Sequence, residues 1–231
     1  NDCTDKLDYY TSEWKKLGFQ PDGIYTGFLS SEKQVDKILD FINSFETENT
    51  LVLVDPVMGD GGRTYSLFTD ALACKMKKLV TVADVITPNL TECCILCDVD
   101  YCEFIKNADK PDFMDKIAEL GKNLLNRYGV KIVIITGIDH KDIDGTMYVQ
   151  NLIASKDEVF SVSCKKIGGS YSGTGDLFAS VMFSGLLRGD TLRDTVSLAV
   201  KFIETSLRDT VALGIDRNEG IEFEKHLKIL L

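Results

Sequence analysis

Ser172-Gly-Thr-Gly-Asp-Leu-Phe-Ala-Ser180 is the stretch that decides the fold, because a glycine turn opens directly into an apolar helix reaching about Arg188. Glycines let the backbone approach a ligand closely. The N–H groups and the positive dipole end of the helix suit an anion such as a transferring phosphoryl group. Asp176, in the first turn, could accept a proton from an attacking hydroxyl. A simpler explanation stays open, in which this is a capping turn and Asp176 only stabilises the helix dipole.

Outward from this segment, strand and helix signals alternate along the chain. Continuous apolar runs such as Leu51-Val-Leu-Val-Asp55 are typical of strands buried on both faces of a parallel sheet. The patterns predict strands over 23–27, 51–55, 84–87, 131–136, 147–153 and 159–164, of which the last two are antiparallel. They predict helices over 4–17, 70–79, 90–97, 112–127, 173–188 and 192–207, and two more that begin at 31 and at about 220. This alternation predicts a single α/β domain with a mostly parallel sheet and helices on both faces.

Polar residues fall at the predicted carboxyl ends of the strands, where ligands bind in such folds. Asp55, Thr87 and Thr136 each stand at such an end. Asp55 begins a glycine-rich loop, 56–63, that carries a second carboxylate, Asp60. Carboxylates there could hold Mg²⁺ through its water shell, although an ordinary solvated turn explains the loop as well.

The segment Thr87-Pro-Asn-Leu-Thr-Glu92 supports two interpretations. Asn89 and Glu92 are three residues apart at a helix start, so they share a face and could bind a hydrated Mg²⁺ that bridges nucleotide phosphates. The same spacing is a capping box, in which Asn89 caps the helix and Glu92 reaches back to it. The residues alone leave both interpretations open.

Composition excludes several classes of protein. The 26 basic and 36 acidic side chains give a net charge of −10 over 231 residues, which argues against a nucleic-acid or anionic-membrane surface. No apolar run approaches the roughly 20 residues of a membrane span. The seven cysteines, together with a start that shows no signal peptide, favour a reduced, cytoplasmic protein. Cys94 and Cys97 have CxxC spacing, so a redox protein is a further alternative.

Taken together, four motifs carry a resemblance to a known family. V-D-P-V-M-G-D at 54–60, I-T-P-N-L-T-E at 86–92, V-I-I-T-G at 133–137 and S-G-T-G-D-L-F-A-S at 172–180 occur in the order found in pyridoxal/pyridoxamine kinases of the ribokinase-like superfamily. The segment Ile24–Phe28 also matches that group. The resemblance implies a three-layer α/β/α fold and ATP-dependent phosphorylation of the hydroxymethyl group of a vitamin B6 vitamer: pyridoxal, pyridoxamine or pyridoxine.

The resemblance also assigns roles to individual residues. It implies that Asp176 is the catalytic base and contacts the substrate, and that Gly173, Thr174 and Gly175 form the anion hole for the γ-phosphate. The implied ATP-binding residues are Asp55, Thr87, Asn89, Thr136 and Gly137. Asn89 and Glu92 match the Mg²⁺–phosphate motif, and some members of the family also hold a monovalent cation such as K⁺. Tyr25 and Phe28 fall near the mouth of the substrate pocket, where Phe28 could pack on a pyridine ring.

One departure limits what the resemblance implies about substrates. Members of the family begin with a further strand, a substrate-contacting loop and a lid hairpin before the position equivalent to Asp2. We therefore expect residues 1–231 to form one kinase domain without those elements. We also expect the protein to form a homodimer, because relatives commonly do. Two alternatives stay open: hydroxymethylpyrimidine kinase, which shares the fold, and a non-catalytic nucleotide-binding relative.

Overall fold

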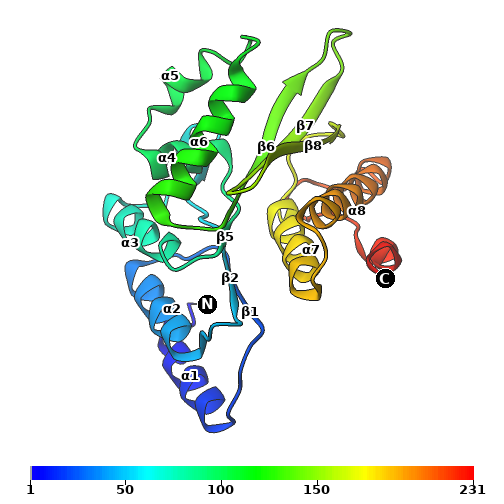
Figure 1. Cartoon of the computed structure of the whole chain (residues 1–231). Coiled ribbons are helices and arrows are strands. Elements are labelled where there is room, and N and C mark those ends of the chain that lie inside the picture. Colours follow the sequence, from blue (N-terminus) through cyan, green and yellow to red (C-terminus); the bar gives the residue numbers. More distant parts are fainter. Residues whose placement is uncertain (1) are drawn as a thin grey trace.

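A central sheet with helices on both faces organises residues 2–231, the part of the chain that the computed structural model describes (Figure 1). Within these residues the sheet has six strands in the order β1-β2-β5-β6-β7-β8. The first four are parallel to one another, and β7 and β8 are antiparallel. The strands are β1 (Gly23–Thr26), β2 (Leu51–Val54), β5 (Val85–Ile86), β6 (Ile132–Lys141), β7 (Met147–Ser155) and β8 (Val159–Lys165), and a separate two-stranded ladder pairs β3 (Gly59–Asp60) with β4 (Arg63–Thr64).

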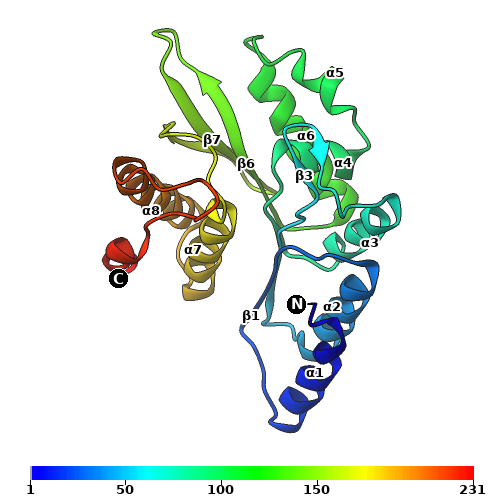
Figure 2. The same cartoon turned by 180° about the vertical axis from the view of Figure 1, so that it is seen from behind.

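The helices divide into two layers, which confirms the predicted α/β/α architecture (Figures 1 and 2). One side of the sheet carries α1 (Leu7–Lys16), α2 (Glu32–Phe45), α3 (Asp70–Val80), α4 (Leu90–Cys97), α5 (Tyr101–Ile105) and α6 (Phe113–Tyr128). The other side carries α7 (Thr174–Arg188), α8 (Leu192–Ala212) and the 3₁₀ helix η2 (Glu224–Leu230). Two hydrophobic cores follow from this division, one on each face of the sheet. None of the helices within residues 2–231 is both long and apolar enough to cross a membrane.

Alternation of side chains along the strands assigns residues to the two cores. Val52 and Val54 of β2 point into the core of the α2–α6 layer, whereas Leu53 between them points into the core beneath α7 and α8. All three are fully buried, as the apolar run predicts. Helices therefore cover both faces of the parallel half of the sheet. Polar side chains that could bind a ligand lie at the ends of its strands.

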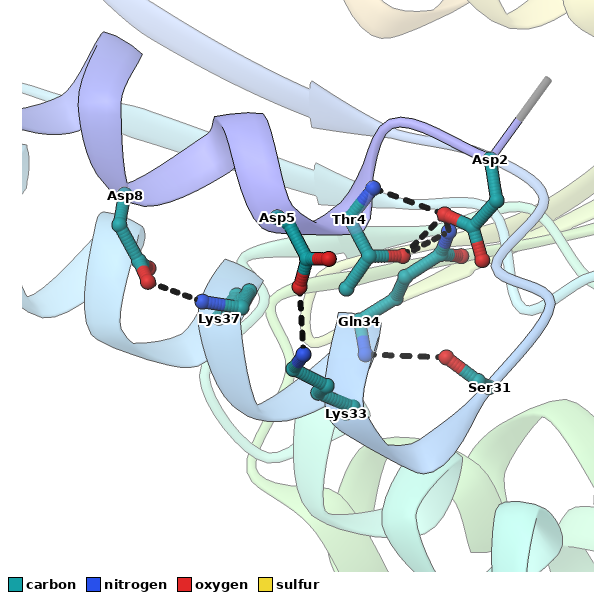
Figure 3. A network of polar contacts seen from close by, with 8 residues as sticks. All are labelled: Asp2, Thr4, Asp5, Asp8, Ser31, Lys33, Gln34 and Lys37. Carbon is teal, nitrogen blue, oxygen red and sulfur yellow. Dashed lines mark hydrogen bonds and ion pairs between the residues drawn. The ribbon is translucent and has the colours of Figure 1, made fainter.

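The N-terminal helix α1 buries none of its side chains and is held on α2 mainly by polar contacts (Figure 3). Lys33 of α2 pairs with Asp5 at 2.6 Å, and Lys37 pairs with Asp8. Asp5 belongs to the 3₁₀ turn η1 (Thr4–Lys6), so the predicted helix over 4–17 begins as 3₁₀ and continues as α. Apolar anchoring comes from Trp14, whose ring centroid lies 5.7 Å from that of Phe41.

Several elements differ from the sequence prediction. The predicted loop 56–63 contains β3 and leads into β4, and α5 was not predicted at all. A two-residue strand shows no detectable periodicity, and its pairing depends on Gly59, where an added Cβ would lie 2.2 Å from the carbonyl oxygen of Arg63. The last helix is a 3₁₀ helix that begins at Glu224 rather than near residue 220, and β6 and α8 run longer than predicted.

Candidate active site

Three adjacent strands bring polar side chains to one edge of the sheet. Asp55 and Thr87 directly follow β2 and β5, and they are only 8% and 4% exposed. Each stands two residues beyond an apolar residue, Leu53 or Val85, that packs in the core beneath α7. Because side chains alternate along a strand, Asp55 and Thr87 point to that same face. Tyr25 of β1, which is in register with Leu53, also packs there.

Asp55 is a buried acidic residue that lies near a second carboxylate, that of Asp176. Burial, together with the nearby Asp176 carboxylate, raises the pKa of Asp55 to about 7. The nearby hydroxyl of Thr87, which is buried at the neighbouring strand end, opposes this rise and lowers the pKa of Asp55 in part. The Asp55 carboxyl and the Thr87 hydroxyl beside it are two oxygen groups that a hard cation could take as ligands.

The glycine element forms the N-terminus of α7, as predicted. Gly173 is its N-cap residue with a φ of 81°, a conformation that glycine adopts at little cost. The first bond of the helix runs from the Leu177 N–H to the Gly173 carbonyl at 3.0 Å, so the N–H groups of Thr174, Gly175 and Asp176 precede the helical ladder. A Cβ added at Gly173 or Gly175 would meet nothing within 4 Å, so this backbone faces open space. The element can therefore receive an anion.

A pocket of about 330 Å³ lies beside this helix start. It brings together five residues predicted from separate motifs, namely Asn89, Thr136, Gly137, Thr174 and Gly175. Asn89, beyond the end of β5, also forms a parallel bridge with Thr136, which lies within β6 rather than at its end as predicted, because β6 continues to Lys141 past an irregularity between Ile135 and Ile138. Residues up to 86 positions apart in sequence thus converge on one cavity next to the free N–H groups of α7.

The same pocket has charged residues of both signs and an apolar wall, its acidic members being Asp60, Asp139 and Glu204. Lys165 and Lys166, at the end of β8, line it, and Lys166 pairs with Asp139 at 2.6 Å. The apolar lining includes Val149, Ile167, Phe178, Val200, Ile203 and Leu207. A cavity with an apolar wall, lysines and exposed helix N–H groups suits a molecule with a flat apolar part and an anionic part.

Asp176 lies on the other side of the glycine element. It is exposed, and with Gly173 it lines a second hollow of about 400 Å³ closed by the segment from Ile215 to Glu224. Its Oδ1 lies 3.3 Å from the hydroxyl of Tyr25. The carboxylate therefore stands between two cavities, directly beside the N–H groups that could hold an anion.

The motif from Asn89 to Glu92 forms a complete capping box. Asn89 Oδ1 accepts from the Glu92 N–H at 3.0 Å, and Glu92 Oε2 accepts from the Asn89 N–H at 2.8 Å. Glu92 Oε1 accepts from the Met58 N–H at 3.0 Å, and Asn89 Nδ2 donates to the Gly59 carbonyl at 2.7 Å. Burial and the nearby Asp55 raise the pKa of Glu92 above its usual range, and the backbone N–H groups that bond to its oxygens oppose this shift. The capping interpretation holds in the structure, and metal binding by these two residues stays a prediction.

Acidic and thiol side chains of residues 2–231 form no cluster of three or more, with or without histidine, that could hold a metal ion by themselves. Any hard cation at the sheet edge would therefore take a carboxylate together with hydroxyl, carbonyl or water oxygens. Asp55 and Thr87 offer two such oxygens at neighbouring strand ends, which fits a cation that keeps several waters.

Comparison with known proteins decides the family. A model of the phosphomethylpyrimidine kinase family matches residues 15–220. The chain belongs to this family. The predicted pyridoxal-kinase-like, ribokinase-like fold is thereby confirmed, since pyridoxal kinases are among the solved structures that share it.

Relatives of this family member are moderately similar in sequence. A candidate phosphomethylpyrimidine kinase from Bacteroides thetaiotaomicron, crystallised with pyridoxal, is 36% identical, with a TM-score of 0.88 over 100% of this chain and 78% of that one. A candidate pyridoxal kinase from Schizosaccharomyces pombe is 29% identical over 72% of this chain and 47% of its own length. A hydroxymethylpyrimidine/phosphomethylpyrimidine kinase from Staphylococcus aureus is 27% identical over 85% of this chain and 66% of its own length. The chain thus spans about half to two thirds of the length of these two curated relatives.

The structure gathers most, but not all, of the predicted site residues of this family member. Asp55 and Thr87 do not line the pocket and instead lie buried at the strand ends. Phe28 is 53% exposed beyond the end of β1. Sequence reasoning missed Lys165 and Lys166, although a basic pair after a predicted strand and before Gly168-Gly169 was a visible signal.

The redox alternative finds no support in the cysteines. Burial raises the pKa of Cys94 and of Cys97 to about 11. Because the thiolate is the reactive form, thiols with raised pKa values are poor redox nucleophiles. These two residues act as packing residues of α4 and its surroundings.

Proposed function

We propose that this family member transfers the γ-phosphoryl group of ATP to the hydroxymethyl group of a vitamin B6 vitamer. The observation that carries the proposal is the position of Asp176 between two cavities, with the free N–H groups of α7 beside it. Phosphoryl transfer needs alignment, charge neutralisation and a proton acceptor near the attacking oxygen. This end of α7 offers all three within one turn.

The pocket of about 330 Å³ is the proposed nucleotide side. Its apolar wall suits the adenine, and the lysines at the end of β8 suit the phosphates. The N–H groups of Thr174, Gly175 and Asp176 would hold the γ-phosphate, where preorganised donors and the helix dipole offset the charge that develops during transfer. Gly173 and Gly175 keep this approach free of side chains.

The hollow on the other side of the glycine element is the proposed acceptor side. Asp176 lines it, so its carboxylate can take the proton of a hydroxyl group that attacks the γ-phosphate. A metal ion, when bound, would offset phosphate charge, and Asp55 and Thr87 are the residues we propose to hold it. Mg²⁺ and a monovalent cation such as K⁺ are both consistent with oxygen ligands there.

Two acceptors have specific support. Pyridoxal is favoured by its presence in crystals of the Bacteroides thetaiotaomicron relative and by the Schizosaccharomyces pombe relative. Hydroxymethylpyrimidine is the second candidate, because of the family model and the Staphylococcus aureus relative. Both are flat heteroaromatic rings bearing a hydroxymethyl group, which is the chemistry that Asp176 would serve.

The decisive experiment is an ADP-release assay with ATP and Mg²⁺ on the full-length natural protein. Pyridoxal, pyridoxamine, pyridoxine and hydroxymethylpyrimidine are compared as acceptors, and product phosphorylation is verified by mass spectrometry. We expect the highest kcat/KM with a B6 vitamer. A preference for hydroxymethylpyrimidine would establish the second candidate, and nucleotide binding without turnover of any acceptor would favour a non-catalytic relative. Sedimentation analysis of the same sample tests the proposed homodimer.

A further inference from the structure

Strand β1 packs unusually closely on helix α7. At Gly23 an added Cβ would lie 2.8 Å from side-chain atoms of both Phe183 and Leu187. The atoms that this Cβ would meet are the outer ends of the two side chains, so glycine lets Phe183 and Leu187 pack on β1 without being displaced. Gly23 thus lies at the contact between β1 and α7, the two elements that carry Tyr25 and Asp176 (Figure 1).

Two residues further along the same face of β1, Tyr25 reaches Asp176. The Tyr25 hydroxyl lies 3.3 Å from Asp176 Oδ1, across 151 positions of sequence. Gly27, the next residue on that face, leaves space there, since a Cβ would lie 3.6 Å both from Asp176 Oδ1 and from the Tyr25 hydroxyl. Gly23 therefore faces the later part of α7, whereas Tyr25 and Gly27, just beyond β1, both face Asp176 in its first turn.

The hydroxyl can only act as the donor in this pair. Burial, with added effects of the Asp55 and Asp176 carboxylates, raises the pKa of Tyr25 well above its usual range. The phenol stays protonated at any physiological pH, so its O–H is available to the carboxyl oxygen. Tyr25 therefore donates to Oδ1 of Asp176.

We propose that Tyr25 is a positioning residue, whose hydroxyl holds Oδ1 of Asp176 so that Oδ2 is presented to the acceptor hydroxyl. This inference rests on the proposed function, in which Asp176 takes the proton. It differs from the sequence prediction that Tyr25 binds substrate, because here the hydroxyl acts through Asp176 rather than on the acceptor. Without the hydrogen bond the carboxylate would rotate freely in an exposed position, and fewer bound acceptors would meet it correctly aligned.

The test is Tyr25→Phe in the full-length enzyme, which keeps the ring and removes only the hydroxyl. Loss of one hydrogen bond to a charged group predicts a fall in kcat of about tenfold. The KM values for ATP and for the acceptor should stay within about twofold. The matched control is Tyr128→Phe, which removes another half-buried hydroxyl, bonded to the Leu96 carbonyl at 2.7 Å on the far side of the sheet, and should leave kcat unchanged.

A double-mutant cycle separates positioning from substrate binding. If Tyr25 acts through Asp176, adding Tyr25→Phe to Asp176→Asn should lower kcat by less than about twofold further, measured by transfer of radiolabelled phosphate. A raised acceptor KM at unchanged kcat, equal effects in both backgrounds, or wild-type kcat in Tyr25→Phe would each overturn the inference. Failure of the proposed function is distinguishable, because then Asp176→Asn itself would keep wild-type kcat.

Discussion

The carboxylate of Glu92 accepts the backbone N–H of Asn89 at 2.8 Å, while the side chain of Asn89 accepts the N–H of Glu92 at 3.0 Å. The second Glu92 oxygen is also engaged, by the Met58 N–H at 3.0 Å. Glu92 therefore joins the start of α4 to the loop that follows β2. This structural role is present whether or not the residue also contacts a metal.

Glu92→Gln should consequently destabilise the fold. The glutamine amide offers one acceptor oxygen where the carboxylate offers two, so its NH₂ group would face a backbone N–H. A buried unsatisfied donor costs about 1–3 kcal/mol of unfolding free energy, measurable by urea denaturation. Glu103→Gln is the matched control, since Glu103 holds the same third helical position in α5 but is exposed, and should change stability by less than about 0.5 kcal/mol. Equal stability of wild type and Glu92→Gln would show that the capping box contributes little to the free energy of unfolding.

Asp55 should make stability fall as pH rises from about 4 to about 7. Its pKa in the folded protein is about 7, against an ordinary value of 3.8, because of burial and the nearby Asp176. Between these values the folded state keeps a proton that the unfolded state has released, so the slope is negative and reaches about 1.4 kcal/mol per pH unit at most. Asp55→Asn should flatten the curve relative to wild type in urea denaturation at several pH values. Parallel curves would mean that Asp55 is ionised throughout.

A bound cation should compete with that proton. Mg²⁺ or K⁺ binding requires the ionised form of Asp55, so either ion should raise the melting temperature of the wild type more at pH 8 than at pH 6. In Asp55→Asn this pH-dependent difference should disappear. Thermal shift measurements without nucleotide provide the readout, and an identical response at both pH values would place the cation elsewhere.

Asp176→Asn should abolish most of the proposed activity while sparing nucleotide binding. The substitution keeps the shape of the side chain and removes its basic oxygen, and loss of a general base typically costs about 10²–10⁴-fold in kcat. The dissociation constant of ATP should change by less than about tenfold, or ~1.4 kcal/mol, in titration calorimetry. Asp190→Asn, at the opposite end of α7 and paired with Arg188, is the control that should leave kcat unchanged. A kcat within a few-fold of wild type would mean that the glycine element acts only as a helix-capping turn.

The thiols of Cys94 and Cys97 should react slowly in the native protein. Their pKa values near 11 leave a very small thiolate fraction at neutral pH. With a thiol-exchange reagent at pH 7.5, the exposed residues Cys74 and Cys102 should be labelled first, and Cys94 only after denaturation, as followed by peptide mass spectrometry. Rapid native labelling at Cys97 or Cys94 would revive the redox alternative.

Much of the architecture was predictable because it depends on local patterns. The apolar run at 51–54 defines β2, and Ser31 caps α2 through the Gln34 N–H at 3.3 Å, as its spacing predicts. The helix start at Gly173 could be predicted because glycine followed by an apolar stripe is a short-range signal. The ladder of β3 and β4 could not be predicted, since its formation depends on the approach of Gly59 to Arg63 rather than on periodicity.

The sequence by itself determined the order of strands and helices, the polar residues at the strand ends and the glycine turn before Asp176. Only the tertiary structure decided which side chains these residues contact. Asp55 becomes a buried acid beside Asp176, and Tyr25 becomes the donor to Asp176, because β1 packs on α7 at the distance that Gly23 permits. Such pairings join residues more than a hundred positions apart, and they arise from the packing of whole elements, which no local propensity encodes.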